Sequence, residues 1–193
     1  MKKLIPVIFI FAFFIIGCAQ VKNNEIETTE IGNDENLVDE VANMKLTSSA
    51  FKHNGKIPSE YTCDGDDISP ELHIADVPKN AKSLALIMDD PDVPKNLRPS
   101  GLWIHWVAWN IPANTKTIPK AAEPEGVGGN SDFKRTGYGG PCPPVREHRY
   151  FFKLYALDTE LDLPEGSTKA ELEKAMQRHI IEKTELIGLY KRR

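Results

Sequence analysis

The chain has 193 residues and a formal net charge of -4, from 24 basic and 28 acidic residues. Three of the basic and seven of the acidic residues precede residue 45, so the rest of the chain carries 21 of each and is formally neutral. A neutral domain without a basic stripe excludes nucleic acid as the expected partner. The length suits one domain with appendages.

The first 17 residues predict a secretory signal rather than part of a fold. Two lysines precede an apolar run over residues 4–16, and Gly17 and Cys18 follow it. The run has about 13 residues, short of the roughly 20 that cross a bilayer. We therefore expect residues 1–17 to be cleaved and Cys18 to be lipidated, which predicts an exported, membrane-anchored lipoprotein of the cell envelope. A plain signal peptide and an uncleaved anchor are the alternatives.

Residues 18–44 predict an acidic tether. After Cys18 they contain seven carboxylates against a single lysine, and no aromatic residue. Such a stretch cannot bury enough apolar surface to offset its ordering entropy, and its charges repel one another. We expect the tether to be disordered and extended, with the folded domain occupying residues 45–193.

The folded domain has the periodicity of strands. Apolar runs occupy residues 83–88, 103–111 and 150–157, and the second of them is apolar on both faces. Segments rich in Gly and Pro separate the runs, most densely between residues 126 and 144. This pattern predicts a mainly β fold of the antiparallel β-sandwich class.

One amphipathic helix is predicted near the C-terminus, followed by a closing strand over residues 185–190. Thr168 and Glu171 have the spacing of a capping box. Side chains at the spacing of one helix face follow, namely Leu172, Ala175, Met176, His179 and Ile180. His179 on this face is expected to be a packed core histidine rather than a ligand.

Two cysteines remain after Cys18. Cys63 and Cys142 are an even pair in a chain predicted to be exported, where oxidation is permitted. A disulfide between them is one alternative. Two separate thiols are the other, because sequence alone does not place the two Cβ atoms within reach.

Three polar clusters interrupt the apolar pattern. In Asp89-Asp90-Pro91-Asp92, alternate residues of an extended chain share a face, so Asp90 and Asp92 are expected to point together and Asp89 away. His105 lies inside the run Trp-Ile-His-Trp, where an unpaired buried polar group costs about 1–3 kcal/mol. The third cluster is a glycine-rich loop followed by the segments Pro141-Cys142-Pro143-Pro144 and His148-Arg149-Tyr150.

The order of these motifs resembles the phosphatidylethanolamine-binding protein family, also called the Raf kinase inhibitor-like family, in its bacterial and archaeal branch. The motifs are Asp-Pro-Asp-x-Pro at residues 90–94, Trp-x-His-Trp at 103–106, and the Pro-Pro and His-Arg-Tyr segments. The resemblance runs from about residue 44 to 190 and includes Tyr61-Thr62-Cys63-Asp64-Gly65. It implies a large antiparallel β-sandwich with few helices.

The resemblance also implies one shallow anion-binding pocket. It assigns Asp90, His105 and His148 to the pocket lining, with walls from Tyr150, Trp103, Pro143 and Pro144. Two imidazoles beside a carboxylate are expected to favour the protonated form and to donate to phosphate, sulfate or carboxylate oxygens. Backbone N–H groups of the glycine-rich loop are expected to add donors.

The sequence departs from the family pattern at two places. Arg146 stands where a glycine is expected two residues before His148, so Arg146 and Glu147 are expected to add charge at the pocket mouth. Leu102 stands where eukaryotic relatives often have an acidic residue, so their headgroup preferences do not transfer.

We therefore expect a membrane-anchored binding protein for a phosphate or phospholipid headgroup, with a regulatory role and no cofactor. The alternative is a protein inhibitor of a peptidase or kinase that acts through surface loops, although export would exclude cytoplasmic kinases. Enzymatic action is not expected. Two weaker alternatives to a binding protein are a thiol enzyme that uses a Cys142–His148 pair and a metal site built from Asp90, His105 and His148.

Overall fold

The computed structural model describes residues 43–192. The predicted signal peptide, the lipidation site Cys18 and nearly all of the predicted tether lie outside the described residues. Within residues 43–192, no helix is both long and apolar enough to cross a membrane.

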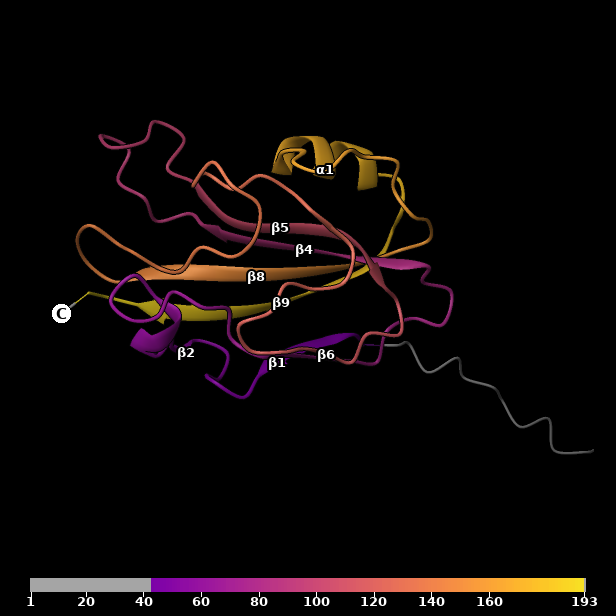
Figure 1. The fold of residues 1–193 in the computed structure, drawn as a ribbon, viewed down its shortest axis with the longest axis horizontal. Helices are drawn as coiled ribbons and strands as arrows, with labels where there is room; N and C mark the ends of the chain where they lie inside the picture. The colour runs from indigo at the N-terminus through magenta and orange to yellow at the C-terminus, as the bar shows by residue number, and fades with distance from the viewer. Residues whose placement is uncertain (1–42, 193) are drawn as a thin grey trace, which may run out of the picture. The chain divides into compact units, whose positions relative to one another are not determined.

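The fold consists of two β-sheets and one α-helix, which confirms the expected mainly β class (Figure 1). The larger sheet has six strands in the spatial order β2 (Gly55–Lys56), β9 (Ile180–Tyr190), β8 (His148–Leu157), β4 (Ser83–Asp90), β5 (Trp103–Pro112) and β7 (Val127–Gly128). The smaller sheet has the order β1 (Lys45–Ser48), β3 (Leu72–Ala75) and β6 (Thr117–Ile118). A 3-10 turn, η1 (Ser59–Tyr61), and the helix α1 (Lys169–Met176) complete the fold.

Strand β4 is buried along its whole length, because both of its faces are covered. One face packs into a core shared with the small sheet, where Leu84 and Leu86 meet Leu46 and Leu72. The other face packs beneath α1, where Ala85 and Ile87 meet Leu172. Figure 1 shows α1 on the side of the large sheet opposite to the small sheet. This double burial explains why the sequence of β4 is continuously apolar rather than alternating.

The antiparallel pairing around β4 brings the three polar clusters together. Strand β4 ends at Asp90, which is paired with Trp103 at the start of β5. The neighbouring strand β8 starts at His148 and pairs with β4 on its other side, with Phe151 opposite Asp89. The end of β4 therefore lies between the beginnings of β5 and β8.

Two expectations about the C-terminal region are wrong. The capping box of Thr168 and Glu171 is present, but α1 ends at Met176, and β9 begins at Ile180 rather than at residue 185. The reason is the pairing of β9 with β8, which starts at Ile180 opposite Leu157 and leaves no room for another helical turn.

His179 is therefore not a core residue. Its side chain is about half exposed, with Nδ1 2.8 Å from Oδ1 of Asp158. One further difference concerns strand direction: β2 pairs with β9 in parallel, whereas the other strand pairs of the described chain are antiparallel.

Candidate functional site

Asp90 and His148 form a buried pair at the end of β4. Nδ1 of His148 lies 2.7 Å from Oδ2 of Asp90, and both side chains are almost completely shielded from solvent. The other carboxylate oxygen of Asp90 accepts a hydrogen bond from the backbone N–H of Asp92 at 2.8 Å. Because Asp90 holds Nδ1, the ring of His148 has a fixed orientation and its Nε2 faces away from the carboxylate.

Asp89 and Asp92 are engaged elsewhere. Asp89 points to the opposite face of the sheet, as expected, and accepts from Nζ of Lys153 at 2.8 Å. Asp92 lies in the turn beyond the strand, where its two carboxylate oxygens accept from Nε and Nη2 of Arg149, each at 2.8 Å. The hydrogen bonds from Arg149 lower the pKa of Asp92 below its usual range.

The expectation that both histidines favour the protonated form is wrong for His105. Its Nδ1 lies 2.6 Å from the backbone oxygen of Gly139, and the ring is buried. Burial lowers the pKa of His105 below the usual value, and this effect outweighs the opposing influence of the Gly139 carbonyl and of Asp90. With Nδ1–H donated to Gly139, the neutral ring presents the lone pair of Nε2 rather than a second donor.

The glycine-rich loop does not offer its backbone donors as expected at Gly139 and Gly140. The N–H of Gly139 donates to the oxygen of His105 at 3.1 Å, and the N–H of Gly140 donates to Oδ1 of Asp67 at 2.7 Å. A side chain at Gly139 would collide with the ring of Phe133 at 2.3 Å, which explains the need for glycine there. These hydrogen bonds position the loop and leave the two N–H groups unavailable to a ligand.

A cavity of about 260 Å³ opens beside this cluster. Four of the predicted site residues line it, namely Asp90, Trp103, His105 and Pro144, together with Val93, Leu97, Arg98, Phe133 and Cys142. Three predicted residues, His148, Tyr150 and Pro143, are buried and do not line it. His148 and Tyr150 belong to β8, whereas Pro143 lies in the loop before it.

One buried polar atom behind the cavity, Nε2 of His148, has no hydrogen-bond partner among the described residues. The ring that carries it is held by Asp90, which lines the cavity. The hydroxyl of Tyr150 is also buried and interacts with the carboxylate of Asp90 through a side-chain hydrogen bond, and the rings of Tyr150 and His105 are 5.2 Å apart, edge to face. Burial and the carboxylate of Asp90 raise the pKa of Tyr150, which keeps its hydroxyl as a donor.

Arg98 is a cavity residue that the sequence analysis missed. Its Nη2 donates to Oδ1 of Asp132 at 2.7 Å, and its guanidinium lies 5.0 Å from the ring centre of Trp103. This arrangement places a permanent positive charge on the cavity wall. The sequence showed an arginine in the loop between the Asp-Pro-Asp-x-Pro and Trp-x-His-Trp motifs, but nothing in the sequence indicated that its side chain would point toward the cavity.

Cys63 and Cys142 form a disulfide, with their Cα atoms 5.4 Å apart. The N–H of Cys63 also donates to the oxygen of Pro141 at 3.1 Å, so the wall segment is joined to the chain after η1 by two links. In this form Cys142 carries no free thiol, and the Cys142–His148 pair lacks its nucleophile. Within residues 43–192, no three His, Cys, Asp or Glu side chains form a group suited to a metal ion.

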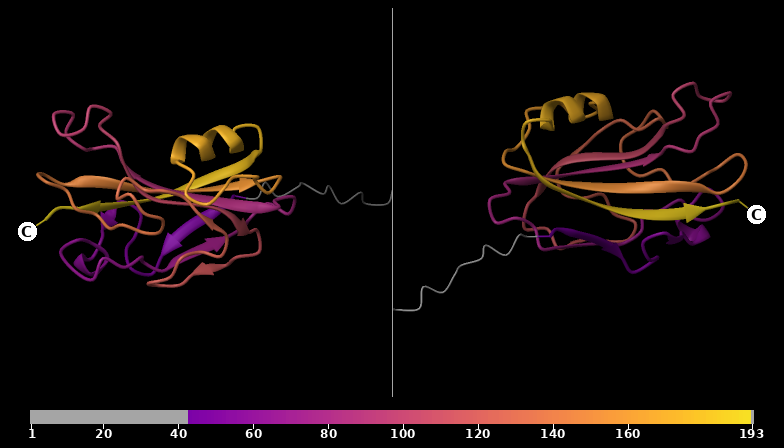
Figure 2. Two further views of the ribbon diagram at one scale, coloured as in Figure 1. Left: turned by 45° about the horizontal axis from the view of Figure 1, so that its top comes forward. Right: turned by 180° about the vertical axis from the view of Figure 1, so that it is seen from behind.

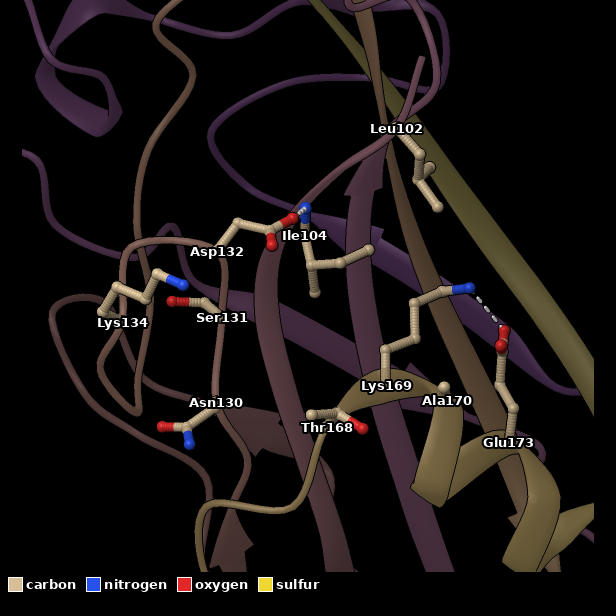
Figure 3. A pocket seen from close by; sticks show the side chains of 10 residues that line it. All are labelled: Leu102, Ile104, Asn130, Ser131, Asp132, Lys134, Thr168, Lys169, Ala170 and Glu173. Carbon is tan, nitrogen blue, oxygen red and sulfur yellow. Dashed lines mark hydrogen bonds and ion pairs between the residues drawn. The ribbon is translucent and has the colours of Figure 1, made fainter. Parts of the chain in front are cut away.

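A second cavity, of about 560 Å³, lies between the start of α1 and residues 130–134 (Figure 3). Ile104 lines this cavity and its neighbour His105 lines the first, because successive residues of a strand point to opposite faces. The charged groups of this second cavity are largely paired, with Lys169 bonded to Glu173 at 2.6 Å and Asp132 accepting from the N–H of Ile104 at 2.7 Å. Asp132 lines the second cavity and is bonded to Arg98, which lines the first, so this ion pair connects the two cavities.

Comparison with known proteins supports the assignment that the motifs suggested. The model of the family described as "Phosphatidylethanolamine-binding protein" matches residues 47–191. A UPF0098 protein of Methanothermobacter thermautotrophicus is 50% identical over 155 residues, covering 77% of this chain and 99% of the relative.

Two solved structures are also similar. A putative phosphatidylethanolamine-binding protein homologue from Chlamydia trachomatis has a TM-score of 0.76 at 46% identity, covering 78% of this chain and 98% of that one. YbcL of E. coli, described as a new member of the mammalian family, has a TM-score of 0.70 at 30% identity, with 78% and 99% covered. The chain belongs to the phosphatidylethanolamine-binding protein family.

Proposed function

We propose that the cavity beside Asp90 binds a small anion, either phosphate or the phosphate ester of a headgroup. The observation that carries the proposal is the buried Nε2 of His148, which has no partner among the described residues and belongs to a ring held by the cavity residue Asp90. Buried polar groups in folded proteins almost always have partners, so an unpartnered atom behind a cavity supports a ligand that completes it.

The chemistry of the cavity supports an anion with a less polar remainder. Arg98 supplies a guanidinium whose charge is shared with Asp132, and Tyr150 supplies a neutral hydroxyl, whereas Trp103, Phe133 and Pro144 provide rigid apolar walls. A few polar groups in an otherwise apolar lining are typical of sites for small organic ligands.

The function is binding rather than catalysis. A hydrolase of the thiol type would need a free Cys142, which is held in the disulfide. A buried Asp–His pair such as Asp90 and His148 can act as a base, but the described residues that line the cavity include no Ser, no Thr and no free Cys to serve as its nucleophile. A neighbouring nucleophile is the feature that an acyl- or phosphoryl-transfer site requires.

Two further inferences complete the proposal. We infer that the two sheets form the antiparallel β-sandwich that the resemblance implies, which their shared core around Leu46, Leu72 and Leu84 supports. We also infer that the domain is held at a membrane by a lipidated Cys18 and regulates a process there through its ligand.

Substitution of Tyr150 tests the proposed site. The variant Y150F removes the buried hydroxyl without changing the shape of the core. We expect binding of phosphate and glycerophosphoethanolamine to weaken by about tenfold to a hundredfold, because a hydrogen bond to a charged group contributes about 1.5–3 kcal/mol. Isothermal titration of the full chain in detergent measures this affinity.

Tyr155 provides the matched control, because it lies on the same strand but faces the opposite side of the sheet. The variant Y155F should bind both ligands as the natural chain does. The unfolding free energy gives a second readout: Y150F should stay folded and lose at most about 3 kcal/mol, since the change removes one buried hydroxyl that interacts with Asp90. Equal affinity in Y150F and the natural chain, or no binding in either, would contradict the proposal.

A further inference from the structure

Two of the three most exposed large apolar side chains of the described chain flank the mouth of the first cavity. Leu97 is 62% exposed and Val145 is 56% exposed, whereas the third, Ile180, lies at the start of β9 with 40% exposed. Leu97 itself lines the cavity, and Val145 follows Pro144, which also lines it. Single exposed apolar residues are ordinary, but two at one mouth indicate a contact surface.

The two loops that carry these side chains project from the same end of the large sheet. Figure 1 and both views of Figure 2 show the loop after β4 and the loop before β8 extending beyond the strands at that end. Nη2 of Arg146 donates to the backbone oxygen of Asp92 at 3.0 Å, which joins the loops to each other. Leu97 and Val145 are therefore presented together on a braced rim, and not on independent segments.

The rim also carries positive charge. Lys95 and Arg146 are exposed, and neither has a carboxylate partner among residues 43–192, whereas Glu147 is an exposed carboxylate beside them. Trp103, half-buried under the guanidinium of Arg98, lies just inside the rim. Apolar tips with adjacent cations and a tryptophan are the composition of a surface that lies on a lipid interface.

We propose that this rim docks on an anionic lipid bilayer, with Leu97 and Val145 entering the interface. The cavity then receives a phosphate-ester headgroup from a lipid that is still in the membrane. The inference rests on the proposed function for the identity of the ligand. A free phosphate ester would need Arg98 and Tyr150 but no exposed apolar tips, whereas a bilayer offers acyl chains to the tips and phosphates to Lys95 and Arg146.

Quenching of Trp103 by brominated lipids tests the docking. The full chain is reconstituted in vesicles of phosphatidylethanolamine and phosphatidylglycerol, with or without bromine on the acyl chains. Trp106 and Trp109 are completely buried and should give an unchanged background. We expect brominated vesicles to quench the emission of Trp103 in the natural chain, and the variant W103F to lose the quenched component.

The variant L97S/V145S should lose at least three quarters of this quenching. The variant I180S is the matched control, because it removes the third exposed large apolar side chain of residues 43–192, which lies at the start of β9 and does not line the cavity, and it should be quenched like the natural chain. Equal quenching in L97S/V145S and I180S, or none in the natural chain, would overturn the proposal. A change of oligomeric state in L97S/V145S without any change in quenching would also overturn it, since the rim would then be a protein interface.

A soluble headgroup separates this proposal from the proposed function. Glycerophosphoethanolamine should bind the single variant V145S with the affinity of the natural chain, because Val145 does not line the cavity, whereas brominated vesicles should quench V145S less than the natural chain. Headgroup binding without quenching would retain the pocket and refute the docking. Quenching without headgroup binding would retain the docking surface and refute the proposed function.

Discussion

His105 and His148 lie close together at one site but are held in different ways. The ring of His148 is held by a carboxylate, Asp90, whereas the ring of His105 is held by a neutral carbonyl, that of Gly139. A carbonyl compensates a buried positive charge far less than a carboxylate does, so burial dominates at His105 and lowers its pKa. His105 is consequently neutral at pH 7 in the ligand-free protein.

This difference predicts that anion binding strengthens as the pH falls. A bound anion beside His105 favours its protonated form, so the complex takes up a proton that the free protein lacks. Sulfate is the suitable probe, because its charge does not change between pH 5 and 8. We expect the affinity for sulfate to rise up to tenfold per pH unit below about pH 6.5, measured by isothermal titration.

The variant H105Q is the control for this prediction, since glutamine can still donate to Gly139 but does not titrate. Its sulfate affinity should vary less with pH than that of the natural chain. In the absence of ligand, the free energy of unfolding should change in the opposite direction to the sulfate affinity. The pKa of His105 is lowered in the folded state, so the unfolded chain binds more protons, and the stability should fall as the pH drops below about 6.5. A pH-independent sulfate affinity in the natural chain would refute the argument.

At the scale of elements, the family resemblance carried by the order of the motifs predicted which residues meet. Asp90, Trp103 and His105 line one cavity because β4 and β5 are antiparallel neighbours. The depth of His148 and Tyr150 was not predictable, since it depends on where loops from distant parts of the chain settle. The same reason hid Arg98, whose direction is set by Asp132.

The helix shows the limit of a periodic pattern. Residues up to Ile180 have the spacing of one helix face, yet α1 ends at Met176. Pairing of β9 with β8, which starts at Ile180, satisfies backbone hydrogen-bonding groups along the whole strand, and this outweighs the hydrogen bonds that one more helical turn would add. Local periodicity could not reveal the competition, because the competing partner is a strand that lies more than 20 residues earlier in the sequence.

The disulfide joins two loops that would otherwise be held mainly by hydrogen bonds. It closes a loop of 79 residues. By the chain-entropy relation, a loop of this length contributes about 4.5 kcal/mol to the free energy of unfolding. We expect the variant C63S/C142S to be destabilised by about this amount, measured by urea unfolding, and to bind phosphate more weakly because Cys142 forms part of the cavity wall.

Reductant supplies the control for this prediction. It should destabilise the natural chain to the level of C63S/C142S and leave the variant unchanged. Equal stability of the oxidised chain and the variant would show that the two loops are held without the covalent link.

For the whole molecule, the neutral charge of the domain limits long-range attraction to an anionic membrane. Docking by the rim must then depend on a small contact area, with two apolar tips and two cations that have no carboxylate partner among residues 43–192. A lipid anchor at Cys18 would make such weak docking sufficient, because attachment turns it into an intramolecular event at a high effective concentration. The predicted anchor and the proposed rim therefore belong to one mechanism.

The anchor is tested by the mass of the N-terminal peptide of the full chain expressed in bacteria. We expect a peptide that begins at Cys18 and carries a diacylglyceryl group, because Cys18 directly follows the apolar run and Gly17. The variant C18S should keep residues 1–17 and carry no lipid. The variant C63S/C142S should be lipidated like the natural chain, which shows that the modification is specific to one cysteine. A mature chain that begins after residue 18, or an unmodified Cys18, would exclude the anchor, and docking would then depend on the rim alone.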